Sequence, residues 1–432
     1  MKNSIKIKEQ FLADRDEVFR EHDKHKDAFK FCVRYSLLVE EYVYRILAGR
    51  KFNFVIASLG SFSRRELAPF SDIDMMIITK SVEENEAEIK SAVTELWDCG
   101  IEVSHTVREF EDIKHFLKED LHAFTQFFET RYLLGRKDIY GEWNQLLFEQ
   151  ITDKDKFNLI NEFFQDTKER YSKYGASPKV LEPNIKFSAG CLRDIHLIEW
   201  MYALKNDMLL SEQSESTQTE KFLTHLKMNK VVNSKEITRI LEAYKVILNA
   251  RIYLHKFNDR DNDRLEFSYQ EKIANALEIG WQDYMKEFFK STSNINRFSR
   301  TMRKRFEEQI SKPISEYLTI NLDEDFTLKG KVISINSDKL LSLPEMMRSF
   351  YYRGLHDGRF DENLRSLIIE SVNEYEETQA EELSSSVFFR EILKLPRNVG
   401  KTLQTMNELG LLGAFLTQFK DLVGFFQPGV YH

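Results

Sequence analysis

The sequence predicts an α+β protein in which a small mixed β-sheet is followed by a large, all-helical region. Only 16 glycines and 7 prolines occur among the 432 residues, and this scarcity of turn-forming residues favours helices. Three short β-rich runs nevertheless lie close together near the N-terminal end, and after Phe110 the apolar residues return to helical spacing. The sheet is therefore expected in one early segment of the chain.

The N-terminal segment and the sheet each have a distinct apolar pattern. Between Lys6 and Ala48 apolar residues recur at helical spacing, which predicts one or two long helices. The β-rich runs predict three strands, at 52–59, 75–79 and 101–107. Residues 82–99 begin with glutamates and carry an apolar face, so they predict a helix that crosses from the second strand to the third.

Two later segments complete the expected order of elements. Lys118 to Gly135 predicts a helix that closes the sheet domain, with Gly135 as its stop signal. Residues 327–335 alternate between apolar and polar and are interrupted by a glycine, which is typical of an isolated hairpin or of a strand packed on the helices.

The chain is too long for one ordinary core, so more than one domain is expected. Polar stretches mark candidate boundaries near 136–156, 211–220 and 322–342. The expected division is an N-terminal helical segment (1–49), a sheet domain (50–135), a helical domain (136–320) and a mainly helical C-terminal region (321–432).

Composition excludes several classes of protein. With 42% hydrophobic and 31% charged residues the chain is globular, and a net charge of -8 argues against an electrostatic grip on nucleic acid. The basic cluster within 297–305 is typical of a solvated helix face. Three widely spaced cysteines indicate neither a zinc site nor a disulfide framework, and no apolar run has the length of a signal or membrane segment. We therefore expect a cytoplasmic protein without membrane contacts.

The chemistry is concentrated between Leu59 and Asp74. A predicted strand ends at Gly60, a polar turn follows, and Asp72 and Asp74 open the next strand. Residues two apart on a strand share one face, so these two carboxylates can converge on the same cations. Magnesium prefers oxygen ligands and keeps phosphate oxygens in its shell, which suits a carboxylate pair beside a triphosphate. The pattern predicts nucleotidyl transfer with two magnesium ions.

The turn itself supplies candidate nucleotide-binding residues. Gly60 lets the backbone approach phosphates, Ser61 offers a hydroxyl and an amide, and Arg64 is placed to neutralise phosphate charge. Ser63 lies in the same turn. An isolated Asp-x-Asp is commonly only a turn or a solvated strand edge, but here a strand, a Gly-Ser pair, a gap and the two aspartates occur in order.

A third carboxylate is expected on the neighbouring strand. Glu102 shares a face with Ser104, so it is the candidate if that face looks toward Asp72 and Asp74. Glu109 and Asp120 are rivals, and a solvent-exposed Glu102 without a catalytic role is the alternative.

The segment GSFSRRELAPFSDIDMMII (60–78) resembles the transferase motif of the bacterial bifunctional uridylyltransferase and uridylyl-removing enzymes, which modify the nitrogen signalling protein PII. LEPNIKFSAGCLRDIHLIEWMYAL (181–204) resembles a second segment of that family, and the resemblance extends over about residues 50–432. It implies a polymerase-β-like nucleotidyltransferase fold followed by a helical domain. It also implies UTP and magnesium as cofactors and a tyrosine hydroxyl on PII as the acceptor.

Individual positions match both motifs of the family. The transferase motif is matched by Gly60, Arg64, Glu66, Asp72 and Asp74. The second motif is matched by Asn184, Lys186, Gly190, Leu192, Arg193 and Asp194, of which Arg193 and Asp194 can equally form a buried ion pair. Ser61, Ser63 and Arg65 stand where the family has glycine, so the base preference and the acceptor stay open.

The family continues beyond a segment like VGFFQPGVYH into a hydrolase domain and two sensing domains, which this sequence lacks. The resemblance therefore implies a truncated chain or a natural short relative without uridylyl removal. The leading hypothesis is transfer of UMP to a PII-like protein. The alternatives are another nucleotide or acceptor, or a catalytically silent nucleotide-binding regulatory module.

Overall fold

The computed structural model describes residues 2–119, 121–209, 215–310, 319–336, 339–378 and 383–416. The chain forms two compact units, Met1–Phe306 and Glu307–His432. The predicted division at residues 49, 135 and 320 stays a prediction.

One or two long helices were predicted at the start of the first unit, and it contains two, α1 (Lys2–His25) and α2 (Ala28–Ile46). Asp27 starts α2, because its side chain accepts a hydrogen bond from the Lys30 backbone amide at 3.3 Å. Helix α2 buries an apolar stripe that includes Phe31, Val39 and Val43, and this stripe fixes its orientation in the core.

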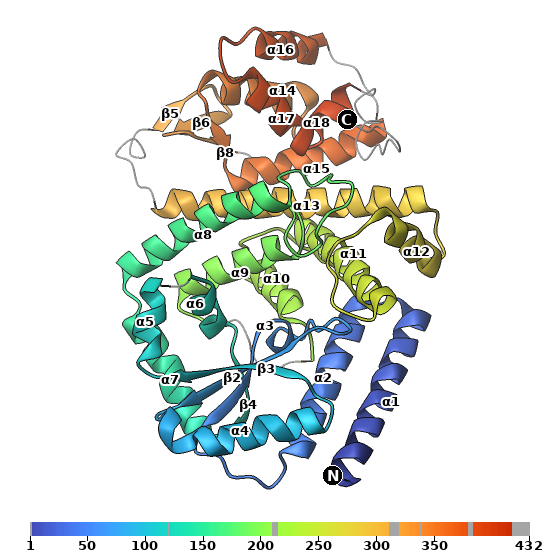
Figure 1. The fold of residues 1–432 in the computed structure, drawn as a ribbon. Coiled ribbons are helices and arrows are strands. Elements are labelled where there is room, and N and C mark those ends of the chain that lie inside the picture. The colour runs from blue at the N-terminus through green and yellow to red at the C-terminus, as the bar shows by residue number, and fades with distance from the viewer. Residues whose placement is uncertain are drawn as a thin grey trace. The chain divides into compact units, whose positions relative to one another are not determined.

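The sheet of the first unit is mixed, with the order β3-β2-β1-β4 (Figure 1). Its strands are β1 (Val55–Ser58), β2 (Ile73–Thr79), β3 (Val103–Glu109) and β4 (Arg131–Gly135). Strand β1 pairs antiparallel with β2 and β4, whereas β2 and β3 are parallel. A parallel pair needs a crossover, and α4 (Val82–Asp98) provides it as predicted. The α+β fold class is confirmed.

The predicted helix over 118–135 is wrong in its second half. Helices α5 (Asp112–Glu119) and α6 (Leu121–Phe128) end before strand β4 begins. Gly135 ends this strand instead of a helix: its φ is +96°, and a β-carbon there would lie 2.0 Å from the Phe54 carbonyl oxygen. Pairing with β1 and two hydrogen bonds from Arg131 to Glu40, at 3.0 and 3.1 Å, hold the segment extended.

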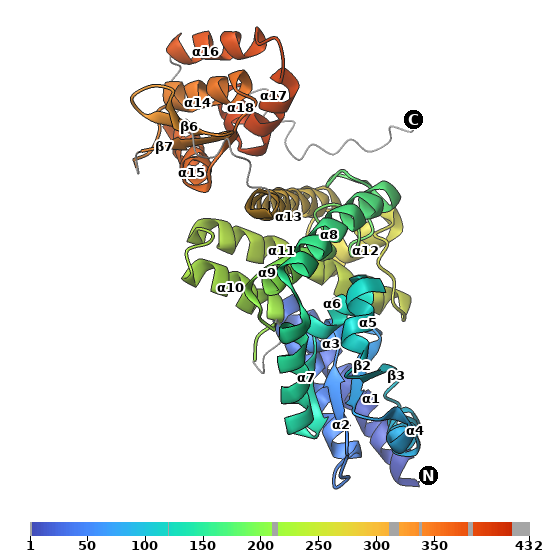
Figure 2. The same cartoon turned by 90° about the vertical axis from the view of Figure 1, so that its left-hand side faces the viewer.

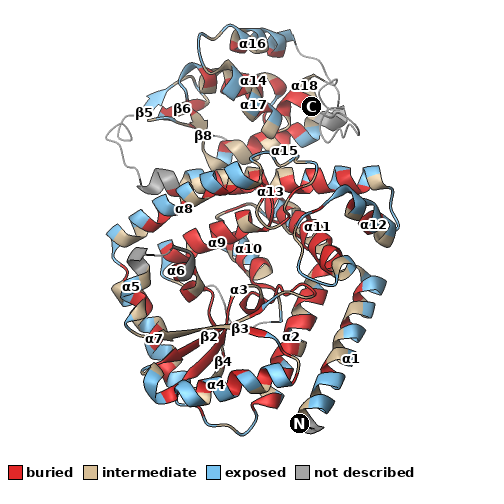
Figure 3. Ribbon diagram, in the orientation of Figure 1, coloured by how far each residue is buried: buried red, intermediate tan, exposed pale blue. Residues whose placement is uncertain are grey.

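The remainder of the first unit is helical. Besides the short helix α3 (Gly60–Ser63), it contains α7 (Lys137–Gln150), α8 (Asp153–Tyr174), α9 (Leu192–Asn206), α10 (Gln218–Met228), α11 (Ser234–Asn258), α12 (Phe267–Leu277) and α13 (Trp281–Ile310). Figure 3 shows β1, β2 and α9 largely buried, whereas most of α1 is exposed or half-buried. Helix α9 is thus a central element, enclosed on nearly every side.

The second unit, orange to red in Figure 2, packs helices on a second small sheet of order β5-β6-β7-β8. Its strands are β5 (Thr319–Asn321), β6 (Phe326–Lys329), β7 (Val332–Ile335) and β8 (Arg359–Phe360). Residues 327–335 do form a hairpin, because β6 and β7 are antiparallel, but the hairpin is not isolated: β5 and β8 extend it to a four-stranded sheet. The helices are α14 (Leu343–Leu355), α15 (Glu362–Thr378), α16 (Leu383–Leu393), α17 (Val399–Glu408) and α18 (Leu411–Phe415).

Two sequence-based exclusions can be compared with the structure. Across the described residues, every helix is too short or too polar to cross a bilayer. Cys32, Cys99 and Cys191 are buried free thiols.

Candidate active site

Asp72 and Asp74 lie at the start of β2 with their side chains on one face of the strand, by the two-residue periodicity. Asp72 is exposed and Asp74 is half-buried. Burial, together with the charge of Asp72, raises the pKa of Asp74 to about 6. Two neighbouring carboxylates, of which Asp74 has the raised pKa, are an all-oxygen donor set whose repulsion a bound divalent cation would relieve.

The predicted glycine turn lies directly against this pair. Gly60 opens helix α3 with φ +53°, and a β-carbon on it would stand 3.2 Å from Asp74 Oδ2. The Leu59 amide donates to the Asp74 carbonyl at 2.9 Å, which fixes the turn on β2. Ser61 is half-buried and Ser63 is buried beside it. The structure therefore brings Gly60 against Asp74, with Ser61 and Ser63 in the same short helix, and the nucleotide-binding roles of the three residues stay predictions.

The Arg64 side chain is bound by the carboxylates of Glu129 and Glu66. It is buried, its Nη1 donates to Glu129 Oε1 at 2.7 Å, and its Nε lies 3.4 Å from Glu66 Oε2. Burial opposes the charge, but Glu129 and Glu66 outweigh it and raise the pKa of Arg64. The guanidinium is therefore committed to an internal ion network.

Arg65 follows with an unusual backbone. Its φ is +56°, which lies in the left-handed region that residues other than glycine and asparagine rarely adopt. The resemblance places glycine at this position, so the backbone geometry agrees with the family pattern although the residue differs. An Arg65 contact with Glu40 at 3.5 Å helps to hold the residue there.

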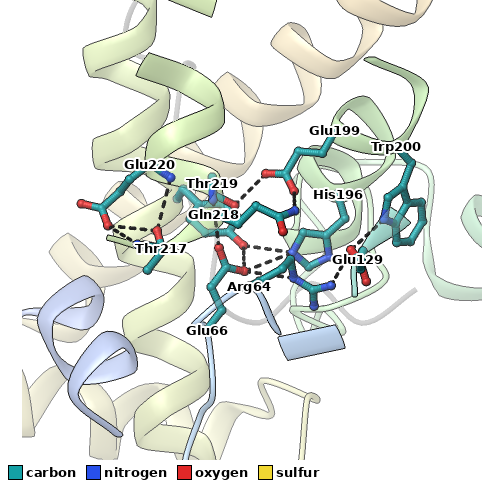
Figure 4. Close-up of polar contacts among 11 residues, drawn as sticks. Arg64, Glu66, Glu129, His196, Glu199, Trp200, Thr217, Gln218, Thr219 and Glu220 are labelled. Atoms are coloured by element: carbon teal, nitrogen blue, oxygen red, sulfur yellow. Dashed lines mark hydrogen bonds and ion pairs between the residues drawn. The ribbon is translucent and has the colours of Figure 1, made fainter. Parts of the chain in front are cut away.

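Glu66 joins the turn to the helical part of the unit, as Figure 4 shows. Its carboxylate accepts hydrogen bonds from Tyr244 Oη at 2.8 Å and from the Thr219 amide at 3.4 Å. His196 Nε2 lies 3.4 Å from the same carboxylate. Burial would raise its pKa, but His196, Arg64 and Thr219 lower it to about 2, so Glu66 stays ionised.

Two further titratable groups of this network come from α9. Burial and the charge of Arg64 lower the pKa of His196 to about 3, so its imidazole is neutral at pH 7. Burial and the charge of Glu66 raise the pKa of Glu199 to about 8. Gln218 and Thr219 donate to Glu199 at 2.7 and 2.9 Å. An ionised glutamate, Glu66, and a largely protonated one, Glu199, thus lie in the same network.

The helical elements also hold the backbone of the segment that leads to Asp72. The Gln218 amide donates to the Arg64 carbonyl at 2.8 Å. His255 Nδ1 donates to the Pro69 carbonyl at 2.5 Å. Together with the Glu66 contacts, these bonds fix the segment at several points, so the sheet and the helices build this site jointly.

The third acid predicted from the sequence is not settled by the geometry. Glu102 is exposed and precedes β3, although the register Asp74↔Ser104 puts its strand face beside the aspartates. Glu109 accepts from the Val82 amide at 2.6 Å, which ties it to the start of α4. Asp120 lies outside the described residues. The role of Glu102 stays a prediction.

Sequence reasoning missed Glu129, whose charge raises the pKa of Asp74. It lies between α6 and β4, and Trp200 Nε1 donates to it at 2.7 Å in addition to Arg64. The segment that contains it was recognised as family-like, but nothing in its spacing assigned Glu129 to the site.

The second motif lies close to the same carboxylates. The positive charge of Lys186 lowers the pKa of Asp74. The alternative that Arg193 and Asp194 form a buried ion pair with each other is wrong. Asp194 is bound instead by Arg170 Nη2 and Tyr171 Oη, both at 2.7 Å, because α8 packs on that side of α9. Asn184 starts this segment through hydrogen bonds to the next residues.

Among the described residues, no group of three or more His, Cys, Asp or Glu side chains is arranged around a metal position. The Asp72–Asp74 pair still fits a magnesium ion that takes its remaining oxygens from phosphates, because such ions are usually held by one or two carboxylates plus substrate.

Comparison with known proteins finds similarity to one group of enzymes. A family model described as GlnD PII-uridylyltransferase matches residues 159–303. The bifunctional uridylyltransferase/uridylyl-removing enzyme of Pasteurella multocida is 28% identical over 87% of this chain and 43% of its own length. The enzymes of the same name from Hydrogenovibrio crunogenus and Aliivibrio fischeri are 27% and 26% identical, over 87% and 100% of this chain and 43% and 50% of their own lengths.

The chain is related to the PII-uridylyltransferases. The resemblance noted from the motifs is thereby confirmed. The chain spans about half the length of the curated relatives that it matches. The part matched by the PII-uridylyltransferase family model contains Lys186, Arg193, His196 and Tyr244, so it includes the helical side of the candidate site.

Proposed function

We propose that this protein is a magnesium-dependent nucleotidyltransferase that transfers UMP from UTP to a tyrosine hydroxyl of a PII-like signalling protein and releases pyrophosphate. The observation that carries the proposal is the close approach of Gly60 to Asp74, with Asp72 on the same face of β2. The relatives named uridylyltransferases support the choice of nucleotide and acceptor.

The roles of the residues follow from their positions. Asp72 and Asp74 would hold magnesium, which when bound neutralises triphosphate charge and makes a hydroxyl easier to deprotonate. The absence of a side chain at Gly60 leaves the turn open to phosphate oxygens, and Ser61 offers a hydroxyl and an amide there. The acceptor oxygen forms a bond to the α-phosphorus, the α–β bridging bond breaks, and the hydroxyl proton leaves with pyrophosphate as the second product.

Transfer to another acceptor, or from another nucleotide, is the second candidate. Ser61, Ser63 and Arg65 alter the turn relative to the motif that the family resemblance supplies, and Arg65 adopts φ +56° without being glycine. These residues belong to the turn that is proposed to hold the donor, so the base preference is the property most open to change.

The test is incubation of the purified protein with magnesium, a PII protein and each α-labelled nucleoside triphosphate in turn. We expect label on PII from UTP, on a tyrosine that peptide mass spectrometry can locate, and none with an Asp72→Asn/Asp74→Asn variant. Label from another nucleotide or on another acceptor would keep the reaction and change the substrate. If no nucleotide gives label transfer that the Asp72→Asn/Asp74→Asn variant abolishes, either with PII or with cell extract, the catalytically silent regulatory module is favoured.

A further inference from the structure

The loop that precedes α9 is rigidly built. Asn184 Oδ1 accepts hydrogen bonds from the amides of Lys186 and Phe187, at 3.0 and 2.8 Å. Ser188 Oγ accepts from the Asn184 amide at 2.9 Å and donates to the Tyr174 carbonyl at 2.7 Å. These bonds close a tight turn that fixes the backbone from which Lys186 projects.

The start of α9 is fixed against the same loop. Gly190 has φ +79° and packs so closely on α13 that a β-carbon would meet the Thr292 carbonyl oxygen at 2.0 Å. The Gly190 amide donates to Asp194 at 2.7 Å, and the Arg193 amide donates to the Lys186 carbonyl at 2.9 Å. Lys186 and Arg193 are therefore neighbours on one preorganised surface.

Two cationic side chains gather around the aromatic rings of this surface. Lys186 Nζ lies 5.2 Å from the centroid of the Phe187 ring, and Arg193 Cζ lies 5.6 Å from the same centroid. Arg193 Cζ is also 4.8 Å from the Trp200 ring. Both side chains are half-buried. The rings orient the two cations but do not neutralise them.

Lys186 and Arg193 differ from three nearby arginines in lacking a paired carboxylate among the described residues. Arg64, Arg170 and Arg251 pair with Glu129, Asp194 and Asp263 at 2.7, 2.7 and 2.8 Å. Within the part of the chain that the structure describes, neither Lys186 nor Arg193 has a carboxylate within ion-pair distance. Two half-buried cations without a directly paired carboxylate are costly, and an anion bound between them would lower that cost.

The electrostatics of the site agree with that argument. Burial and the charges of Arg251 and Arg193 lower the pKa of Lys186 to about 8. Burial and the charge of Arg64 lower the pKa of Arg193 to about 10. The charge of Lys186 in turn lowers the pKa of Asp74, so Lys186 lies near the carboxylate pair, with Arg193 beside it on the Phe187 ring. Positive charge beside a magnesium-binding pair is the arrangement that a polyphosphate requires.

We propose that Lys186 and Arg193 bind the β- and γ-phosphates of the nucleoside triphosphate whose α-phosphate lies at Asp72 and Asp74. The helical part of the unit then supplies the phosphate-neutralising cations that the glycine turn lacks, since Arg64 is occupied by Glu129 and Glu66. This proposal rests on the proposed function in one respect, namely that the donor is a nucleoside triphosphate.

The test uses inorganic tripolyphosphate, which carries the charged part of the donor without base or sugar. Its affinity is measured calorimetrically in the presence of magnesium for the full chain and for Lys186→Gln and Arg193→Gln. We expect each variant to bind about tenfold more weakly or worse, the factor typical of a lost hydrogen bond between charged groups. The control is Lys272→Gln, because Lys272 also lies over a ring, 5.1 Å from the Tyr269 centroid, and should bind as the unchanged protein does.

Unchanged affinity in both variants, or no binding by the unchanged protein, would overturn the proposal. If Arg193→Gln fails to fold, Lys186→Gln and Arg193→Lys decide, and the second of these should retain part of the affinity because it keeps the charge. If tripolyphosphate binding depends on Lys186 but no label is transferred from any nucleotide, this proposal holds and the proposed function is contradicted. Label transfer to PII together with tripolyphosphate binding that is unchanged in both variants would support the proposed function and overturn the roles of Lys186 and Arg193.

Discussion

Gly60 lies so close to Asp74 that a β-carbon on residue 60 would stand 3.2 Å from Asp74 Oδ2. Gly60→Ala should therefore push the carboxylate away and strain a backbone whose φ is +53°. We expect at least about a tenfold loss of nucleotidyl transfer, because a displaced catalytic group costs rate steeply. The assay is label transfer to the acceptor at saturating nucleotide.

Gly49→Ala is the matched control for that variant. Gly49 also has a positive φ, +82°, but its added β-carbon would meet nothing within 4 Å. Both variants should lose roughly 1–2 kcal/mol of stability from backbone strain. Only Gly60→Ala should lose transfer activity, and equal activity of the two variants would contradict the assigned geometry.

Replacing Glu66 should destabilise the first unit. Its carboxylate accepts from Tyr244 at 2.8 Å and faces Arg64 and His196, all in the buried interior. Glu66→Ala leaves these groups without their acceptor, and breaking a buried ion network in this way typically costs about 3–5 kcal/mol. Urea unfolding measures the loss.

A surface glutamate provides the comparison. Glu86 pairs with Lys90, four residues away and also exposed, so Glu86→Ala should lower the free energy of unfolding far less than Glu66→Ala does. A Glu66 variant no less stable than the Glu86 variant would show that the network does not hold the turn on the helices.

Glu199 should make stability depend on pH. Its folded-state pKa, about 8, lies above the ordinary value of 4.5, so the folded protein holds a proton that the unfolded chain has released between these limits. The stability from the neutral carboxyl is fully present below pH 4.5 and is lost as pH rises toward 8. This group contributes up to about 1.4 kcal/mol of loss per pH unit in that window.

Glu199→Gln tests this dependence, because glutamine mimics the protonated acid and can still bond Gln218 and Thr219. The variant should gain stability relative to the unchanged protein as pH rises from 5 to about 8 in paired unfolding curves. Parallel curves for the two proteins over that range would show that Glu199 is ionised throughout.

Gly190 should tolerate no side chain. Gly190→Ala would bring a β-carbon within 2.0 Å of the Thr292 carbonyl oxygen at a φ of +79°. Overpacking and strain together should cost about 3 kcal/mol or more. Gly400→Ala is the control, since nothing lies within 4 Å of its added β-carbon. Thermal unfolding compares them, and similar unfolding temperatures would contradict the tight contact of the loop with α13.

The elements nearest the chemistry were predictable from the sequence because their signals are local. Asp72 and Asp74 precede an apolar run that forms β2, and the glutamates before residues 89–97 mark α4. Strand β4 was missed because RYLLG carries no alternation of its own. Pairing with β1 and the bond between Arg131 and Glu40, 91 residues apart, make it a strand.

The contacts of the polar network around Glu66 could not be predicted from the sequence either. His196 and Tyr244 meet Glu66 across 130 and 178 residues, and periodicity carries no information about such contacts. The one available signal was the presence of Asp194, His196 and Glu199 within an otherwise apolar helix, since polar residues at buried positions need partners. That signal indicates a buried polar network but does not identify which residues of other elements take part in it.

The most direct test of the account is manganese binding followed by electron paramagnetic resonance, with UTP present and no acceptor. The account predicts that the Asp72→Asn/Asp74→Asn variant binds manganese at least about tenfold more weakly than the unchanged protein. Asp138→Asn, which alters an exposed aspartate paired with Arg136, should bind normally. Equal manganese affinity in the double variant and the unchanged protein would contradict the assignment of Asp72 and Asp74 as the metal-binding pair.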